Sequence, residues 1–188
     1  MSGSQVILSV VSGNGILPNV LHNYVGEYSA TTKAMNSVSS YGFRGEALNL
    51  IRYIADLDIV SHSGDFCETY HKSFRNGVCI NYAETANIFT GSGTLVSVSK
   101  IFENVGLRKK YTRFFMEINK IKDFICKMSI LHHRIAWTLY DKTEEKNVLT
   151  LQQERSVASR FLCLHSPDIL SMMTVRKFHF RKCPSNKR

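Results

Sequence analysis

The sequence is poor in proline and in acidic side chains, and its cysteines are neither paired nor clustered. Three prolines and eleven glycines in 188 residues are too few for a collagen-like or low-complexity chain. The five cysteines are an odd number, widely spaced and without a CxxC pair, which argues against a disulfide framework and against a zinc site. We therefore expect free, buried thiols in a reduced, intracellular setting, and we predict no metal site.

Long hydrophobic runs are also lacking. The N-terminal apolar run, residues 6–11, is too short for a signal peptide or a membrane span, so we expect a soluble protein. Apolar residues nevertheless make up 44% of the chain, enough for a folded core. Lysine and arginine number 24 against 15 acidic residues, a net charge of +9 that favours a polyanionic partner such as nucleic acid, a nucleotide or an anionic membrane.

The first half of the chain has the pattern of an antiparallel sheet with helices. Residues 6–11 predict a short strand that ends in a glycine turn, and a polar loop over residues 26–40 precedes a helix that begins near Glu46. Asn76-Gly77 between two apolar runs predicts a β-hairpin. A further strand opens at Gly93, with Thr94, Val96 and Val98 on one face.

A long helix and a second β-rich segment follow. Apolar residues recur at helical spacing over residues 114–128, which predicts one core-facing stripe: Phe114, Ile118, Ile121, Ile125 and Met128. Strands are expected over residues 135–140, 148–151 and 174–180, with a helix capped by Ser156. We place the domain boundaries at 1–131, 132–180 and a basic tail at 181–188.

Two glycine-rich turns are candidate phosphate-binding elements. The first, residues 13–15, follows a strand, and the second, residues 42–45, immediately precedes a helix. Backbone N–H groups at a helix N-terminus can hold a phosphate, and Arg44 can add a charge-assisted bond. Neither turn matches a P-loop or a dinucleotide fingerprint, so two ordinary turns remain the alternative.

A family resemblance appears at the second turn. Residues 41–48, YGFRGEAL, resemble the GFRGEAL signature of the MutL mismatch-repair family, and residues 25–33, VGEYSATTK, resemble its lid segment. GTLVSV at 93–98 is similar to the family's GTxVxV strand. IFEN at 101–104, followed by RKKY at 108–111, is similar to the family's Leu-Phe-x-Asn…Arg-Lys-Phe sequence. SILH at 129–132 looks most like the third eukaryotic homologue, the branch associated with meiotic crossovers.

The resemblance implies an α+β fold: an incomplete GHKL (Bergerat-type) ATPase sandwich, with a mixed sheet and helices on one face. It is followed by the start of an S5-like transducer domain. Carried over by position, Gly13 and Gly15 would line the adenine pocket, and Thr94 would lie behind it. The complete set of implied ATP-binding residues is Gly13, Gly15, Thr31, Thr32, Lys33, Gly42, Phe43, Arg44, Gly45, Glu46, Ala47, Leu48 and Thr94.

Two departures from the family pattern bear on activity. The aspartate that accepts from the adenine amino group falls on Val11, and loss of a buried hydrogen-bond partner costs ~1–3 kcal/mol. The family's first helix, with its water-activating glutamate and magnesium-binding asparagine, has no counterpart in these 188 residues, so we expect a chain truncated at both ends. We therefore name no catalytic residue and expect no appreciable ATPase activity from this polypeptide alone.

A basic segment is the candidate DNA interface. Arg108, Lys109, Lys110, Arg113 and Lys120 lie at the start and along the exposed side of the long helix, where they could contact DNA phosphates without reading sequence. A solvated helix face is the alternative.

Three interpretations of function follow. The leading one is an ATP-binding MutL-homologue fragment of DNA mismatch repair or meiotic recombination. It would act on DNA in the nucleus, with magnesium as in the full-length family and as a heterodimer with a second MutL homologue. The second is a catalytically dead DNA-binding or interaction module. The third is an incomplete gene model of a full ATPase.

Overall fold

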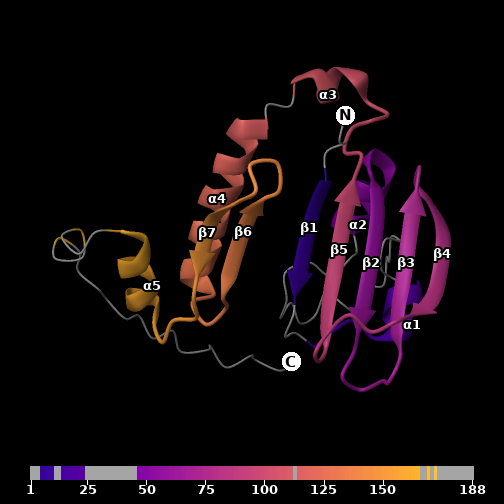
Figure 1. Ribbon diagram of the computed structural model, residues 1–188, viewed down its shortest axis with the longest axis horizontal. Coiled ribbons are helices and arrows are strands. Elements are labelled where there is room, and N and C mark those ends of the chain that lie inside the picture. The colour runs from indigo at the N-terminus through magenta and orange to yellow at the C-terminus, as the bar shows by residue number, and fades with distance from the viewer. Residues whose placement is uncertain are drawn as a thin grey trace, which may run out of the picture. The chain divides into compact units, whose positions relative to one another are not determined.

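The computed structural model describes residues 5–10, 14–23, 46–111, 114–165, 169 and 172, which fall into two units, Met1–Thr112 and Arg113–Arg188 (Figure 1). The long helix therefore groups with the segment after it, whereas the sequence placed a boundary at its end, near residue 131. The assignment of these segments to an ATPase and a transducer domain stays a prediction.

A five-stranded sheet forms the first unit, with strand order β1-β5-β2-β3-β4. The class is the expected α+β, but every ladder among the described strands is antiparallel, whereas the resemblance implied a mixed sheet. The strands are β1 (Gln5–Val10), β2 (Asp56–His62), β3 (Thr69–Arg75), β4 (Val78–Thr85) and β5 (Gly93–Ser99). The predicted hairpin is confirmed: Asn76 and Gly77 both have positive φ, +51° and +78°, as a two-residue hairpin turn requires.

Two helices, α1 (Pro18–Asn23) and α2 (Glu46–Ile54), cover one face of this sheet (Figure 1). The alternation of β2 turns Leu57 and Ile59 toward the helices, where they form a buried cluster with Leu21 and Phe74. From α2, the side chains of Leu48 and Ile51 pack against this cluster. Because α2 joins β2 through Ala55 alone, the helix runs back along the strand.

The second unit contains α4 (Phe114–Leu131), the hairpin of β6 (Trp137–Asp141) and β7 (Lys146–Leu151), and α5 (Val157–Leu164). The predicted helix cap is confirmed, because Ser156 Oγ accepts from Ser159 N at 3.0 Å. The predicted apolar stripe on α4 is wrong in one position: Ile121 is exposed, whereas Ile118, Ile125 and Met128 are half-buried.

Arg160 of α5 is the largest fully buried side chain of the described residues. Its Nη2 donates to three backbone carbonyls: His133 at 3.1 Å, Ile135 at 3.0 Å and Gln152 at 2.5 Å. These carbonyls belong to the segment before β6 and the segment after β7. A single guanidinium therefore ties α5 to both ends of the hairpin.

Several expectations fall outside the described residues or need correction. The polar loop at 26–40 and the strand at 174–180 lie outside them. The expectation of buried cysteines is wrong: Cys67, Cys79 and Cys163 are free and exposed, and Cys126 is half-buried. Among the helices the structure describes, none combines the length and apolar character needed to cross a bilayer.

Candidate functional site

One end of the sheet gathers the described residues that the sequence predicted for the adenine side of the site. The strands β1 and β2 end there, and β5 begins there (Figure 1). The register pairs Thr94 with Val10 on one side and with Ser61 on the other, so three neighbouring strands contribute one row of residues. Thr94 lies on the helix-covered face together with Ser61, because antiparallel partners point to the same side.

Ser61 is the centre of this row, and the sequence analysis did not identify it. Its side chain is 2% exposed. Ser61 Oγ lies 2.7 Å from Thr94 Oγ1 and 3.2 Å from Gly93 O, and it accepts from Ile16 N at 2.8 Å. One buried hydroxyl thus joins the segment before α1 to the start of β5.

Gly15 approaches the end of β2 so closely that no other residue fits. Its φ is +71°, and an added Cβ would lie 2.0 Å from His62 O and 2.9 Å from Ser63 Cα. The glycine is therefore required by packing against the protein's own backbone, in a left-handed conformation that disfavours other residues. This close approach of Gly15 places Ile16 N within hydrogen-bond distance of Ser61 Oγ, which in turn contacts Thr94 Oγ1.

The predicted phosphate-binding helix start is confirmed as a helix, because α2 begins at Glu46. Since α2 runs back along β2, its first residues lie toward the strand end that carries Ser61. Leu48 packs against the core, so it fixes the helix in place, and Ala47 is exposed. Backbone N–H groups at this end are suitable donors to a phosphate.

The remaining predicted nucleotide-binding residues lie outside the described residues, and their roles stay predictions. They are Gly13, Thr31, Thr32, Lys33, Gly42, Phe43, Arg44 and Gly45. Val11, at the position of the family's adenine-binding aspartate, immediately follows β1 and lies outside them too.

Lys72 is a second buried polar residue that the sequence did not reveal. Its side chain is fully buried, and Nζ donates to Leu21 O at 3.0 Å and to His22 O at 2.6 Å. These carbonyls lie near the C-terminus of α1, where a cation is favoured by the helix dipole. Lys72 therefore anchors the helix that follows Gly15 and Ile16.

The predicted basic segment is not one continuous helix. Arg108, Lys109 and Lys110 lie on α3 (Gly106–Tyr111), in the first unit. Lys120 lies on α4, in the second unit, where it pairs with Glu117 at 2.9 Å. Arg113 lies between the two helices, outside the described residues. A shared cationic face therefore stays a prediction.

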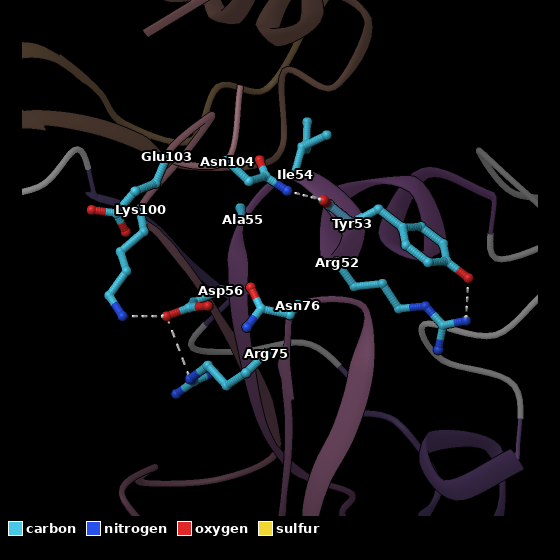
Figure 2. A pocket seen from close by; sticks show the side chains of 10 residues that line it. All are labelled: Arg52, Tyr53, Ile54, Ala55, Asp56, Arg75, Asn76, Lys100, Glu103 and Asn104. Carbon is cyan, nitrogen blue, oxygen red and sulfur yellow. Dashed lines mark hydrogen bonds and ion pairs between the residues drawn. The ribbon is translucent and has the colours of Figure 1, made fainter. Parts of the chain in front are cut away.

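A pocket of about 580 Å³ lies at the opposite end of the sheet, below the C-terminus of α2 (Figure 2). Three carbonyls at this helix end accept hydrogen bonds from other segments. Gly77 N donates to Arg52 O at 2.9 Å, Asn104 Nδ2 to Tyr53 O at 2.8 Å, and Phe102 N to Ile54 O at 2.8 Å. The hairpin and the segment after β5 thereby cap α2.

The charged groups of this pocket largely pair with one another. Asp56 Oδ2 lies 3.0 Å from Lys100 Nζ and 3.5 Å from Arg75 Nε. Dashed lines mark both ion pairs in Figure 2. Arg75 Nη2 also donates to both carboxylate oxygens of Asp58 at 2.9 Å. We therefore assign these residues a structural role. Among the described residues, no group of three or more potential metal ligands is present.

No protein-family model matches the chain. Three curated proteins with similar sequences are DNA mismatch repair proteins. Human Mlh3 is 27% identical over 150 residues, covering 79% of this chain and 10% of Mlh3. MutL of Carboxydothermus hydrogenoformans is 29% identical over 171 residues, covering 87% of this chain and 29% of that protein. MutL of Persephonella marina is 32% identical over 152 residues, covering 76% of this chain and 28% of that protein.

Solved structures share the fold. The Aquifex aeolicus MutL ATPase domain complexed with ADP has a TM-score of 0.66 at 19% identity, covering 84% of this chain and 55% of that one. The N-terminal domain of a DNA repair protein has a TM-score of 0.66 at 22% identity, covering 84% and 46%.

These matches show the fold, which is that of solved MutL ATPase domains. The chain is similar in sequence to MutL-type DNA mismatch repair proteins, human Mlh3 among them. It spans about a tenth of the human relative and less than a third of the two bacterial ones.

Proposed function

We propose that this chain is a nucleotide-binding module of a DNA mismatch-repair or meiotic recombination protein, with ATP as its ligand. The observation that carries the proposal is the cluster of Gly15, Ser61 and Thr94 at one end of the sheet, beside the start of α2. In this arrangement a half-buried hydroxyl faces the base end of the site, and helix N–H groups are available at the phosphate end.

The residues present fit a nucleotide at both ends. Thr94 is half-buried, and its hydroxyl would contact the base. ATP would supply a triphosphate whose negative charge is favoured at the N-terminus of α2. The solved relative complexed with ADP supports the same ligand class. Thr31, Thr32, Lys33 and residues 42–45 would complete the phosphate side, and Gly13 the base side.

A melting experiment tests nucleotide binding. A ligand that binds only the folded state raises the melting temperature as its concentration increases. We expect ATP and ADP to do so, and Thr94→Val to weaken the shift severalfold because the hydroxyl is replaced by a methyl group of similar size. Thr138→Val, an exposed threonine of β6, is the matched control. Equal melting temperatures with and without ATP would overturn the proposal.

DNA binding through the basic segment is the second proposed activity. Three successive cations on α3 support it, because Arg108, Lys109 and Lys110 occupy a helix with no acidic residue in its first turn. Arg113 and Lys120 would be further phosphate contacts of the basic segment. Arg108 also lies over the ring of Phe102, with 5.3 Å from Cζ to the ring centroid, which orients its guanidinium.

Salt dependence tests this interface. Changing Arg108, Lys109 and Lys110 together to glutamine is expected to weaken duplex DNA binding uniformly across sequences and to reduce the slope of log K against log salt by about 3. A triple change of Lys142, Lys146 and Arg155 to glutamine is the charge-matched control in the second unit. An unchanged slope would show that α3 does not contact phosphates.

The wider setting of the protein is proposed from its relatives. We place it in the nucleus, as the resemblance to the third eukaryotic branch implies, and in a heterodimer with a second MutL homologue. Magnesium would accompany ATP as in the full-length family. Salt-sensitive DNA binding that ATP leaves unchanged, without any nucleotide-dependent melting shift, would instead favour a catalytically dead DNA-binding module.

A further inference from the structure

β4 is an edge strand of the first unit, and no described strand pairs with its outer side. In the strand order β1-β5-β2-β3-β4 it pairs with β3 alone, and Figure 1 shows it at the margin of the sheet. Seven of its eight residues are exposed, and Tyr82 is half-buried. An edge of this kind presents backbone N–H and C=O groups along its outer side, which form a template for a second extended strand.

The side chains of β4 do little to prevent such pairing. Natural edge strands commonly carry lysine or proline, which block the approach of a second strand. β4, with the sequence VCINYAET, has neither and carries one charged residue, Glu84. Val78 and Ile80 are apolar and are 63% and 59% exposed. A bulge leaves Ile80 without a partner on β3, so the regular part of the edge, from Asn81 to Thr85, begins directly after these exposed apolar side chains.

We propose that β4 is a self-association surface, on which β4 of a second copy of this chain pairs antiparallel about a two-fold axis. The two sheets then continue across the axis as one sheet. In an interface of this symmetry, a residue i that faces residue j of the other copy is matched by j facing i. With the axis at the middle of the strand, between Asn81 and Tyr82, Ile80 of one copy lies opposite Ala83 of the other. The inference goes beyond the proposed nucleotide and DNA binding and depends on neither.

The distribution of charge favours this edge as the contact between two copies. The chain carries a net charge of +9, so two copies repel each other in most orientations. β4 has no cationic residue, and in the antiparallel pair its one carboxylate, Glu84, faces Cys79 of the second copy rather than the second Glu84. Like charges are therefore not placed directly opposite each other. Because each copy covers the β4 edge of the other, the contact closes on itself and stops at a dimer.

Sedimentation equilibrium of the full 188-residue chain tests the pairing. The wild-type chain is expected to convert from monomer to dimer as its concentration increases, without larger species. Ile80→Lys brings a charge to the edge of each copy and is expected to weaken dimerisation at least about tenfold. Ile88→Lys is the matched control, because Ile88 is 60% exposed but lies after the end of β4. It is expected to leave the dimerisation constant within about twofold of the wild type.

Hydrogen exchange measured by mass spectrometry locates the contact. Backbone N–H groups that enter a strand ladder exchange more slowly with solvent. Residues 78–85 are therefore expected to exchange more slowly at a concentration where the dimer dominates than at one where the monomer dominates. The strand β6 of the second unit serves as an internal reference and is expected to exchange at the same rate at both concentrations. In Ile80→Lys, exchange at residues 78–85 is expected to lose its dependence on concentration.

Each outcome supports or overturns the inference. A wild-type chain that remains monomeric up to about 1 mM overturns it, and so does assembly beyond a dimer. A dimer that Ile88→Lys weakens as much as Ile80→Lys, or that leaves exchange at residues 78–85 unchanged, forms through another surface and also overturns it. A dimer that Ile80→Lys alone disrupts, with exchange slowed at β4, supports it. All measurements are made without nucleotide or DNA, so their outcome is separate from that of the proposed function.

Discussion

Arg160 allows the sharpest test of how the second unit is held together. The perturbation is Arg160→Met, which keeps much of the apolar stem and removes the guanidinium. In the wild-type chain Nη2 donates to the carbonyls of His133, Ile135 and Gln152, and the side chain is 1% exposed. An Nη2 group carries two hydrogens, so one of them is shared between two carbonyls.

The expected loss of stability follows from these contacts. A hydrogen bond from a charged donor contributes roughly 1.5–3 kcal/mol. His133 O also accepts from Glu154 N at 2.7 Å and keeps a partner after the substitution, so we count only the bonds to Ile135 and Gln152. Removing the cost of burying a cation offsets part of their loss. We expect a net destabilisation of about 3 kcal/mol, which lowers the melting temperature of a unit this size by about 10–20 °C.

The assay uses the only tryptophan of the chain, Trp137, which lies at the start of β6 in the same unit. Its fluorescence during thermal unfolding reports on this unit specifically. Arg155→Met removes an exposed arginine five residues away and is the matched control, with a change within about 2 °C. If Arg160→Met melts within that range of the Arg155→Met variant, the carbonyl contacts of Arg160 do not hold the hairpin, and the reasoning is refuted.

Three further predictions follow from single side chains and from the motifs. The hydrogen bond from Cys163 to Glu154, at 3.3 Å, raises the pKa of the thiol, so Glu154→Gln is expected to speed its alkylation at pH 8, measured by mass spectrometry, and an unchanged rate would contradict this. Burial, and secondarily the neighbouring Tyr70, raises the pKa of Tyr82 above its ordinary 10.0, so its contribution to stability is full below pH 10 and is lost as pH rises through the higher folded value. Tyr82→Phe should lose less stability than the wild type above pH 10 in alkaline denaturation. Finally, the polypeptide alone should show no magnesium-dependent phosphate release from ATP, since its motif-matched positions include no general base; release above background would refute this.

The elements that the sequence predicted well are those fixed by neighbouring residues. Asn76 and Gly77 readily adopt the positive φ that a two-residue hairpin turn requires at both positions, so this dipeptide alone predicts the hairpin. Ser156 caps α5 through a bond to Ser159, three residues away. The β5 strand and the start of α2 likewise follow from alternation and helical spacing that can be counted along the chain.

The details that the sequence missed depend on long-range contacts. Ser61 and Thr94 are 33 residues apart, and Lys72 reaches the carbonyl of Leu21 across 51 residues. The predicted burial of Ile121 in the apolar stripe of α4 was wrong. Periodicity shows which residues share a helix face, but it does not show which part of that face another element covers.

The sequence by itself determined the order of the elements, the glycine turns and the resemblance to MutL, because each depends on residues close together in the chain. Only the tertiary structure decided that Ile16, Ser61, Gly93 and Thr94 meet. The physical reason is the register of β5 against β2: a shift of one residue would turn Thr94 to the other face of the sheet, away from Ser61, while leaving every local pattern in the sequence unchanged.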